Sequence, residues 1–347
     1  MALSSKNFRV RNLERFGRSV VYVGGGIGDV VMHLGHFQAI ARASTGNKIC
    51  IACRPATAIA SLFGEADFFD RVIALGDPQA ANDPIPLWPT VHKFRAGGFD
   101  SIFCLKSSVR VMAAARFAGI RHRFGYVRAH DPRAWLLTHK TVVPAKTFHP
   151  RHLSKADLLL NSLSVPFDTA GARLSPAPEF AEAAKALVAG RNSIAVGLNS
   201  SVPGRQWGER YSTLVRRLAE KFNVHFVLYG GADVQELAAV VQANSGLPDD
   251  RFIDIPARGD SLAMSYAILS RCLAYVGNDS SGLNLAVFTG LPAIGLFAVT
   301  PPFTYSPLFI GVEPEQGERG IAGISIDQVY RCTAGFLTKA YPHLVVG

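Results

Sequence analysis

The sequence predicts an α/β protein of two domains, each with a mainly parallel sheet and helices on both faces. Short apolar runs typical of buried strands alternate with helical stretches along most of the 347 residues. The alternation is interrupted around Pro176 and Pro178 and then starts again. We therefore expect one domain over residues 1–170, a second over 171–325, and a C-terminal segment, 326–347, that packs back on the first domain.

The first domain begins as a β-α-β unit. A strand at 19–23 leads through a glycine turn into a helix over 29–43, and a second strand follows at 48–53. The segment 76–98 contains four prolines, so we expect it to be a loop. The remaining elements of this domain are expected as strands at 72–75 and 101–105 and as helices at 57–63, 108–118 and 153–163.

The second domain repeats the same alternation. Its apolar runs have the length of strands and are separated by helical windows, which again predicts a parallel sheet. The strands are expected at 193–198, 224–229, 252–255, 272–276 and 292–297, and the helices at 208–221, 233–244, 260–270 and 280–289.

Charge is unevenly distributed between the two halves of the chain. The formal net charge is +10, yet residues 1–165 carry 22 Lys and Arg against 10 Asp and Glu, whereas residues 166–347 carry 14 against 16. The basic first half would attract an anionic surface or substrate, although a solvated basic face is the alternative. Much of the excess lies between Arg110 and Arg151, at Arg116, Arg121, Arg123, Arg128, Arg133, Lys140 and Lys146.

The cysteines and apolar segments indicate a cytoplasmic globular protein. Five cysteines are an odd number spread over apolar segments, so we expect reduced, mostly buried thiols. Cys50 and Cys53 face opposite sides of a predicted strand, which argues against a zinc site. The apolar stretch Val20–Val23 is too short for a secretion signal. The longest apolar run, Leu283–Val299, is interrupted by glycines and a proline and falls short of the ~20 residues of a membrane span.

Asp29 is the main catalytic candidate of the first domain. It ends a glycine turn between a predicted strand and a helix, at the position where a dinucleotide-binding turn requires a glycine. A carboxylate there would repel a pyrophosphate, so the dinucleotide interpretation fails. Asp29 either stabilises the start of the helix or deprotonates a substrate hydroxyl. His33 and His36 follow four and seven residues later and are predicted to share its face.

Three polar loops of the second domain each follow a predicted strand. Because the carboxyl ends of parallel strands meet at one edge of a sheet, we expect the loops to form a nucleotide pocket. Hydroxyl residues at a helix start suit phosphate, and Arg205 could neutralise a diphosphate. The candidate binding residues are Asn199, Ser200 and Arg205 in the first loop, Gly230 and Gly231 in the second, and Asp279, Ser280, Ser281 and Gly282 in the third.

In their order and spacing these segments resemble glycosyltransferase family 9, the ADP-heptose:lipopolysaccharide heptosyltransferases, over about residues 18–310. The resemblance is carried by Ile27–Val31, by Arg205–Trp207, and by Asp279–Ala286 with the turn Gly290–Pro292. It implies the GT-B fold, in which two Rossmann-like domains with parallel sheets face a central cleft.

The resemblance also implies roles for individual residues. Asp29 would be the base that acts on the acceptor hydroxyl, and Arg205, which stands where the family commonly has a lysine, would hold the donor phosphates. Asn284 is a further donor-binding candidate, in the place of the usual histidine, and Ser281 replaces the usual glycine. The segment Phe297–Pro302 departs from the frequent Phe-Gly-Pro-Thr.

From this resemblance we expect an inverting, metal-independent transfer of a sugar, heptose from ADP-heptose, to a hydroxyl of an anionic glycan or glycolipid such as lipopolysaccharide core. No cofactor is expected besides the nucleotide-sugar substrate, because no Asp-x-Asp pair is present to hold a cation. The acceptor would bind the basic first domain, with His33, His36, Arg121 and Arg123 as candidate contacts. The expected location is cytoplasmic, at the inner face of the cytoplasmic membrane, with peripheral membrane contact.

Two alternatives remain open. A non-catalytic module that binds a nucleotide-sugar is suggested by Asn284 in place of the histidine. An enzyme like the sugar-nucleotide 2-epimerases shares the fold, but the basic first domain argues against it. A nucleic-acid partner is not expected, because no recognised binding module accompanies the arginines.

Overall fold

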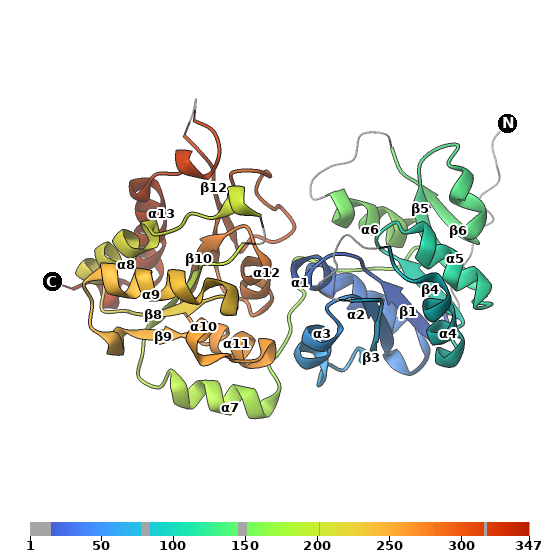
Figure 1. The fold of residues 1–347 in the computed structure, drawn as a ribbon, viewed down its shortest axis with the longest axis horizontal. Helices are drawn as coiled ribbons and strands as arrows, with labels where there is room; N and C mark the ends of the chain where they lie inside the picture. The colour runs from blue at the N-terminus through green and yellow to red at the C-terminus, as the bar shows by residue number, and fades with distance from the viewer. Residues whose placement is uncertain (1–14, 78–83, 145–150, 201, 316–317, 347) are drawn as a thin grey trace. The chain divides into compact units, whose positions relative to one another are not determined.

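The computed structural model describes residues 15–77, 84–144, 151–200, 202–315 and 318–346. The chain divides into two compact units, Met1–Ala172 and Arg173–Gly347. Each unit contains a six-stranded parallel sheet with helices on both faces (Figure 1), which confirms the expected α/β class.

The sheet of the first unit has the strand order β3-β2-β1-β4-β5-β6. Along the chain, the strands begin with β1 in the middle of the sheet and proceed to β3 at one edge. They then resume with β4 on the other side of β1. The reversal point therefore lies between β1 and β4, which pair in parallel. The strands are β1 (Ser19–Tyr22), β2 (Ile49–Cys53), β3 (Phe69–Ala74), β4 (Ser101–Cys104), β5 (His122–Val127) and β6 (His139–Val142).

Two helical layers cover this sheet. Helices α4 (Leu87–Gly97) and α5 (Val109–Phe117) lie side by side and pack on the face that carries Val20, Tyr22 and Ile102 (Figure 1). The helices of the opposite face are α2 (Leu34–Arg42), α3 (Ala56–Phe63) and α6 (Arg151–Ser162).

The structure corrects three expectations for the first unit. The segment 76–98 is not all loop, because α4 occupies its second half; Pro86 precedes the helix and Pro89 lies in its first turn, where a missing N–H costs little. The helix expected over 29–43 is divided into α1 (Ile27–Val31) and α2. Strands β5 and β6 were not expected, because polar residues interrupt their apolar pattern.

The sheet of the second unit repeats the topology with the order β12-β11-β10-β7-β8-β9. Its reversal point lies between β7 and β10. The strands are β7 (Ser193–Gly197), β8 (His225–Tyr229), β9 (Phe252–Asp254), β10 (Ala274–Asn278), β11 (Ala293–Leu296) and β12 (Phe309–Val312).

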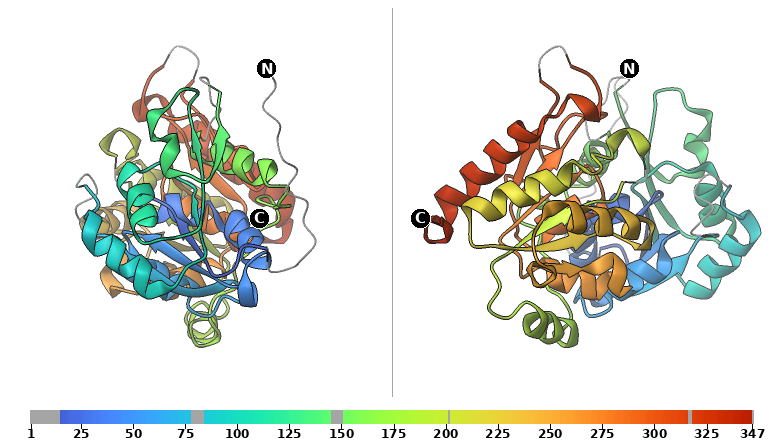
Figure 2. Two further views of the ribbon diagram at one scale, coloured as in Figure 1. Left: turned by 90° about the vertical axis from the view of Figure 1, so that its right-hand side faces the viewer. Right: turned by 60° about the vertical axis from the view of Figure 1, so that its left-hand side comes forward.

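Helices α8 and α9 and the terminal helix α13 cover one face of the second sheet, and α8 and α13 lie side by side (Figure 2). The expectation that residues 326–347 pack on the first domain is wrong. Val329, Ala334 and Leu337 give α13 an apolar stripe that is buried in the core of the second unit. The helices of the unit are α7 (Pro178–Leu187), α8 (Arg210–Lys221), α9 (Gln235–Ser245), α10 (Ile255–Arg258), α11 (Leu262–Leu269), α12 (Ser281–Phe288) and α13 (Ile326–Ala340).

The cysteines are as expected. All five are free thiols, and only Cys332 is not fully buried. Burial raises the pKa of Cys53 and Cys104 to about 12, which keeps both protonated. Among the residues that the structure describes, no helix is long and apolar enough to cross a bilayer.

The close approach of β7 and β10 requires glycine at position 277. A Cβ on Gly277 would lie 2.6–2.9 Å from backbone atoms of Gly197, which cannot move aside as a side chain can. We expect Gly277→Ala to lower the free energy of unfolding by about 1–3 kcal/mol, as overpacking does. Gly335→Ala is the matched control: it has open space in α13 and should leave stability unchanged or raise it by about 0.5–1 kcal/mol. Denaturant unfolding measures both; equal stabilities of the two variants would contradict this account.

Candidate functional site

Asp29 in the first unit and Asn199 and Asp279 in the second lie where the strand order of each sheet reverses. In open α/β sheets a ligand crevice forms at this point, outside the carboxyl ends of the strands. In the first unit, β1 leads to Asp29 and β4 leads to Lys106. In the second unit, β7 leads to Asn199 and β10 leads to Asp279. The topology therefore gives each unit one expected binding edge.

Asp29 lies in the short helix α1, and the turn before it is shaped around its carboxylate. Its Oδ2 accepts a hydrogen bond from the Gly26 N–H at 3.1 Å and lies 3.8 Å from Nζ of Lys106. Gly25 has a φ of +108°, and a Cβ there would lie 1.8 Å from Asp29 Oδ2, so only glycine fits. The side chain of Asp29 remains 31% exposed. It supports the helix start and still presents a carboxylate to solvent.

One basic pocket adjoins this turn, and a second basic pocket lies next to the first. One has a volume of about 330 Å³ and is lined by Gly24 and Gly25 together with Arg54, Lys106 and Arg110. The other has a volume of about 410 Å³, and its charged lining is Arg128, Asp131, Arg133 and Lys155. Both are lined by Ser107, so they are neighbours at the carboxyl ends of the strands. Cationic groups outnumber carboxylates in both, which suits an anionic ligand.

His33 and His36 do not contribute to this surface. Both side chains are fully buried. His36 Nε2 pairs with Asp157 Oδ1 of α6 at 2.8 Å, and its ring stacks on Phe167 at a centroid distance of 5.1 Å. The expectation that the two histidines contact an acceptor is wrong, because the helical face that they share packs into the unit.

Arg123 is also a structural residue, whereas Arg121 is exposed. The buried guanidinium of Arg123 donates from Nε to the Leu136 carbonyl at 2.7 Å and from Nη1 to the Ile120 carbonyl at 2.5 Å. Its expected role as an acceptor contact is therefore wrong. Lys146, part of the expected basic stretch, lies outside the described residues.

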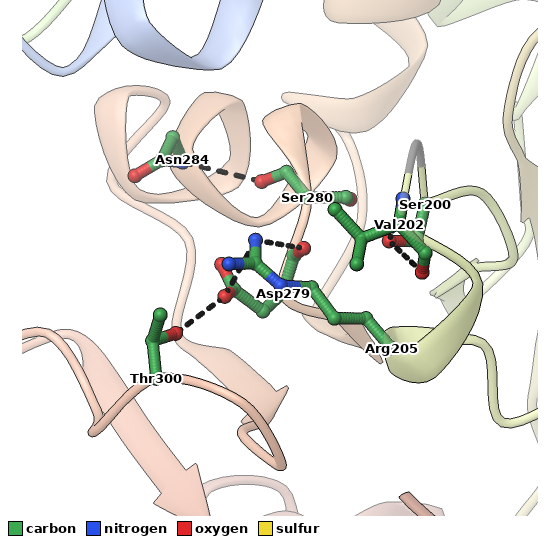
Figure 3. Close-up of polar contacts among 7 residues, drawn as sticks. All are labelled: Ser200, Val202, Arg205, Asp279, Ser280, Asn284 and Thr300. Atoms are coloured by element: carbon green, nitrogen blue, oxygen red, sulfur yellow. Dashed lines mark hydrogen bonds and ion pairs between the residues drawn. The ribbon is translucent and has the colours of Figure 1, made fainter.

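In the second unit, the half-buried Arg205 forms an ion pair with the buried Asp279 (Figure 3). Arg205 Nη1 lies 2.9 Å from Asp279 Oδ2, and Thr300 donates its hydroxyl to the same oxygen at 2.7 Å. Burial raises the pKa of Asp279, and the Thr300 hydrogen bond and the Arg205 charge partly offset that effect. The pair holds the guanidinium at the carboxyl end of β10, where the sequence predicted a phosphate contact.

Several buried polar atoms near this pair lack a hydrogen-bond partner among the described residues. Ser280 begins α12 without capping it, and Tyr275 places its hydroxyl against Gly197 and Gly282, where a Cβ would lie within 2.7 Å of it. Buried polar groups without partners are uncommon and indicate a missing ligand or water. The atoms are Asn199 Oδ1, Arg205 Nε and Tyr229 Oη, whereas the hydroxyls of Tyr275 and Ser280 contact each other.

Most of the other candidates of the second unit lie in the loops after β8 and β10, whereas Ser200 bonds within its own loop. Gly230 lies beside Asn199, and a side chain there would collide with Val234, so this loop keeps the backbone close to the site. Gly231 is exposed after β8, while Ser281 and Gly282 form the first turn of α12. Ser200 instead exchanges hydrogen bonds with the backbone of Val202 at 3.2 Å (Figure 3), which shapes its own loop.

Asn284 is bonded within the protein at both ends of its amide. Its Nδ2 donates to the Ser280 carbonyl at 3.2 Å (Figure 3), and its Oδ1 accepts from the Tyr305 hydroxyl. Tyr305 in turn packs against the rings of Phe288 and Phe309. The residue that replaces the family's usual histidine is thus 3% exposed and joins the start of α12 to the segment after β11.

Asn278 and Thr300 hold the candidate site residues in place, and the sequence did not predict this role. Asn278 Oδ1 accepts from the Trp207 N–H at 3.2 Å and from the Tyr211 hydroxyl at 3.1 Å, and its Nδ2 donates to the Leu198 carbonyl at 2.8 Å. It therefore fixes the segment that carries Arg205. The sequence signal for Asn278 was its position directly before Asp279. The signal for Thr300 was the departure of its segment from the family pattern.

The described residues contain no group of three or more His, Cys, Asp or Glu side chains arranged to hold a metal ion. In the described part of the chain, the charged groups at the candidate residues are the Arg205–Asp279 pair in the second unit and, in the first unit, Asp29 with the cations of the two pockets.

Comparison with known proteins adds a family match and similar folds. The family model that describes glycosyltransferase family 9 (heptosyltransferase) matches residues 88–311. A structure of the E. coli ADP-heptose lipopolysaccharide heptosyltransferase II aligns over 93% of this chain and 99% of that chain, with a TM-score of 0.72 and 18% identity. A family 9 glycosyltransferase from Veillonella parvula aligns over 94% and 99%, with a TM-score of 0.73 and 19% identity.

A structure of E. coli heptosyltransferase WaaC with ADP aligns over 93% of this chain and 99% of that chain, with a TM-score of 0.68 and 17% identity. These likenesses establish the shared two-domain GT-B fold. A search of curated proteins finds no match.

The three hydrogen bonds of Asn278 give a stability prediction. Asn278→Ala should lower the free energy of unfolding of the second unit by roughly 2–4 kcal/mol, because it leaves buried donors and an acceptor unpaired. Asn223→Ala is the control, since the exposed Asn223 makes only a 3.4 Å contact with Arg251 and should cost less than about 0.5 kcal/mol. Equilibrium unfolding by tryptophan emission, with the buried Trp207 as the local probe, measures both. A loss for Asn278→Ala no larger than for the control would rule out this role.

Proposed function

Because the chain belongs to glycosyltransferase family 9, we propose that this glycosyltransferase transfers heptose from ADP-heptose to a hydroxyl of an anionic glycan or glycolipid such as lipopolysaccharide core. The reaction would invert the anomeric configuration and need no metal ion. Asp29 would be the base, and Arg205 would bind the donor diphosphate.

The observation that carries the proposal is the environment of Asp29. An accessible carboxylate follows β1 at the reversal point and is held by the Gly26 N–H, beside a pocket lined by Lys106 and Arg110. The carboxylate can accept a proton from a hydroxyl that is bound there. Lys106 balances its charge and, with Arg110, would attract an anionic acceptor toward it.

The second unit offers the groups that a nucleotide diphosphate requires. Arg205 retains an unpartnered Nε among the described residues while Nη1 holds Asp279, so it can donate to a phosphate without breaking the ion pair. The Ser280 hydroxyl and the N-terminal amides of α12 add further donors. An ADP-linked sugar is favoured as donor because family structures of similar fold contain ADP or ADP-2-deoxy-2-fluoro heptose.

These roles combine into a balanced displacement. The acceptor hydroxyl gives its proton to Asp29, and its oxygen forms a bond to the anomeric carbon of the donor. The bond from that carbon to the diphosphate oxygen breaks on the opposite face, and the electron pair leaves with the nucleotide diphosphate. Arg205 and the start of α12 would stabilise the charge that develops on the departing group.

The two neighbouring basic pockets favour a transferase over the alternatives. Their volumes of about 330 and 410 Å³ provide room for an acceptor in the unit that carries Asp29. An epimerase or a nucleotide-binding module would need no such acceptor site. The glycolipid acceptor would be encountered at the inner face of the cytoplasmic membrane.

The donor assignment is tested by calorimetry with ADP, GDP and UDP, with and without EDTA. We expect ADP to bind equally with and without the chelator. Arg205→Gln should weaken ADP by about 10–100-fold, since one charge-assisted hydrogen bond contributes about 1.5–3 kcal/mol. Arg205→Lys should retain part of the affinity, and Arg216→Gln, on an exposed part of α8, is the control. If no nucleotide binds, the donor assignment fails; if binding requires a metal, the metal-independent mechanism fails.

The role of Asp29 is tested separately by turnover. Asp29→Asn should bind ADP as the wild type does but release ADP from ADP-heptose, with an inner-core glycolipid acceptor, about 10²–10⁴-fold more slowly. Asp67→Asn, an exposed carboxyl of the same unit, is the matched control and should leave turnover unchanged. Unimpaired turnover in Asp29→Asn would remove Asp29 from the chemistry.

A further inference from the structure

Three large aromatic side chains are exposed together on the outer helical layer of the first unit. Trp88 of α4 and Trp135 of the short helix η2 (Pro132–Leu136) are each 60% exposed, and Phe117 of α5 is 44% exposed. The rings of Trp88 and Phe117 stack at a centroid distance of 5.8 Å, and the guanidinium of Arg116 lies 4.8 Å above the ring of Trp135. We call Trp88, Arg116, Phe117 and Trp135 the aromatic patch.

The patch is not required by the core beneath it. Helices α4 and α5 lie side by side (Figure 1) and use other residues to cover the sheet, including Val91, Phe94 and Val111, which are buried. Exposed apolar area of this kind is unfavourable in water and marks interaction surfaces when it is clustered.

The charge around the patch selects its partner. Residues 84–136 contain nine Lys and Arg and two acidic residues, Asp100 and Asp131, and Asp131 is already paired with Arg133 at 2.6 Å. Helices α4, α5 and η2 contain no Asp or Glu at all, while Lys93, Arg95, Arg110 and Arg116 are exposed on them. Protein-binding surfaces commonly mix both charge signs at their rims, whereas a surface of one sign around tryptophans matches anionic headgroups.

We propose that the aromatic patch docks the first unit on the surface of a bilayer that contains anionic phospholipid. Trp88, Phe117 and Trp135 enter the interfacial region, where amphipathic aromatic rings are favoured, and the surrounding arginines pair with lipid phosphates. The two contributions act together, since neither a few rings nor a basic surface alone holds a protein firmly.

The patch also continues into the basic pocket beside Asp29. Pro84 and Ile85 line that pocket three to four residues before Trp88, and Arg110 lines it while donating to the Ile85 carbonyl at 3.4 Å. A unit that rests on lipid through the patch therefore brings the pocket rim close to the headgroups. This last step rests on the proposed glycolipid acceptor, whereas the docking itself does not.

The docking is tested with the full chain and lipid vesicles, with no substrate present. Vesicles of phosphatidylcholine with phosphatidylglycerol in about a two-to-one ratio are compared with phosphatidylcholine alone by co-sedimentation. We expect binding to the anionic vesicles only, and its loss as salt is raised. Two of the three tryptophans belong to the patch and Trp207 is buried in the second unit, so binding should shift tryptophan emission to the blue.

Substitutions in the patch separate it from the general basic charge. Trp88→Ser with Trp135→Ser should weaken vesicle partitioning by roughly tenfold or more, and Arg116→Gln by about fivefold. The matched controls are Val346→Ser and Arg216→Gln, which change an exposed apolar residue and an exposed arginine of the second unit. All variants should keep the far-ultraviolet circular dichroism spectrum and the unfolding midpoint of the wild type, which shows that the fold of the first unit is intact.

The proposal is overturned if the patch variants bind anionic vesicles as the wild type does, or if the wild type binds neither vesicle. Self-association of the wild type that is lost in the patch variants, without vesicle binding, would assign the patch to a second copy of the chain and would also overturn it. If the wild type does not bind ADP, the proposed donor is wrong, but the docking result is unaffected.

Discussion

In both sheets the strand order reverses beside the first strand, and the chemistry follows from that reversal. Two strands that leave the centre of a sheet in opposite directions keep the connections after them apart, which opens a space at their carboxyl ends. In the first unit Asp29 and Lys106 enter this space from β1 and β4. In the second unit the space receives Asn199 and Asp279 from β7 and β10, with Arg205 paired to Asp279. Each site is therefore built from the segments that directly follow these strands.

The second site is shaped by one amide. Asn278 is the last residue of β10, and its side-chain amide bonds to the loop before α8, to the first turn of α8 and to the end of β7. The segment that carries Arg205 is thereby held to the sheet, and this brings the guanidinium next to Asp279. A rigid support of this kind limits the reorganisation that is needed when charge develops on a leaving group.

The sequence predicted the elements whose signal is local. Apolar runs bounded by glycine identified β1, β7 and β10 and the turns that follow them, because such strands are buried on both faces. It failed for α4, where Pro89 is tolerated in the first turn, and for β6, an edge strand whose residues alternate between half-buried and exposed. The face predicted for Asp29, His33 and His36 is divided, because Asp29 stays accessible in α1 whereas both histidines are buried. His36 pairs with Asp157 of α6, which is far away in the chain.

The same limit applies to the arginines and to the second site. Arg121 and Arg123 are two residues apart in the sequence, yet one is exposed and the other bonds buried carbonyls of Ile120 and Leu136. No local pattern distinguishes them, because the fate of a charged side chain is decided by what packs over it. Thr300 contacts Asp279 only because β11 runs beside β10, which is a tertiary fact.

The unsatisfied atoms around Arg205 have a consequence for how this unit can evolve. Tyr229 keeps a buried hydroxyl without a partner among the described residues, and leaving such a group unpaired costs stability. Replacing such hydroxyls with apolar groups of similar shape would relieve that cost and at the same time remove the groups that a polar ligand satisfies. Selection for a more durable unit and selection for tighter binding therefore act in opposite directions on the same few side chains.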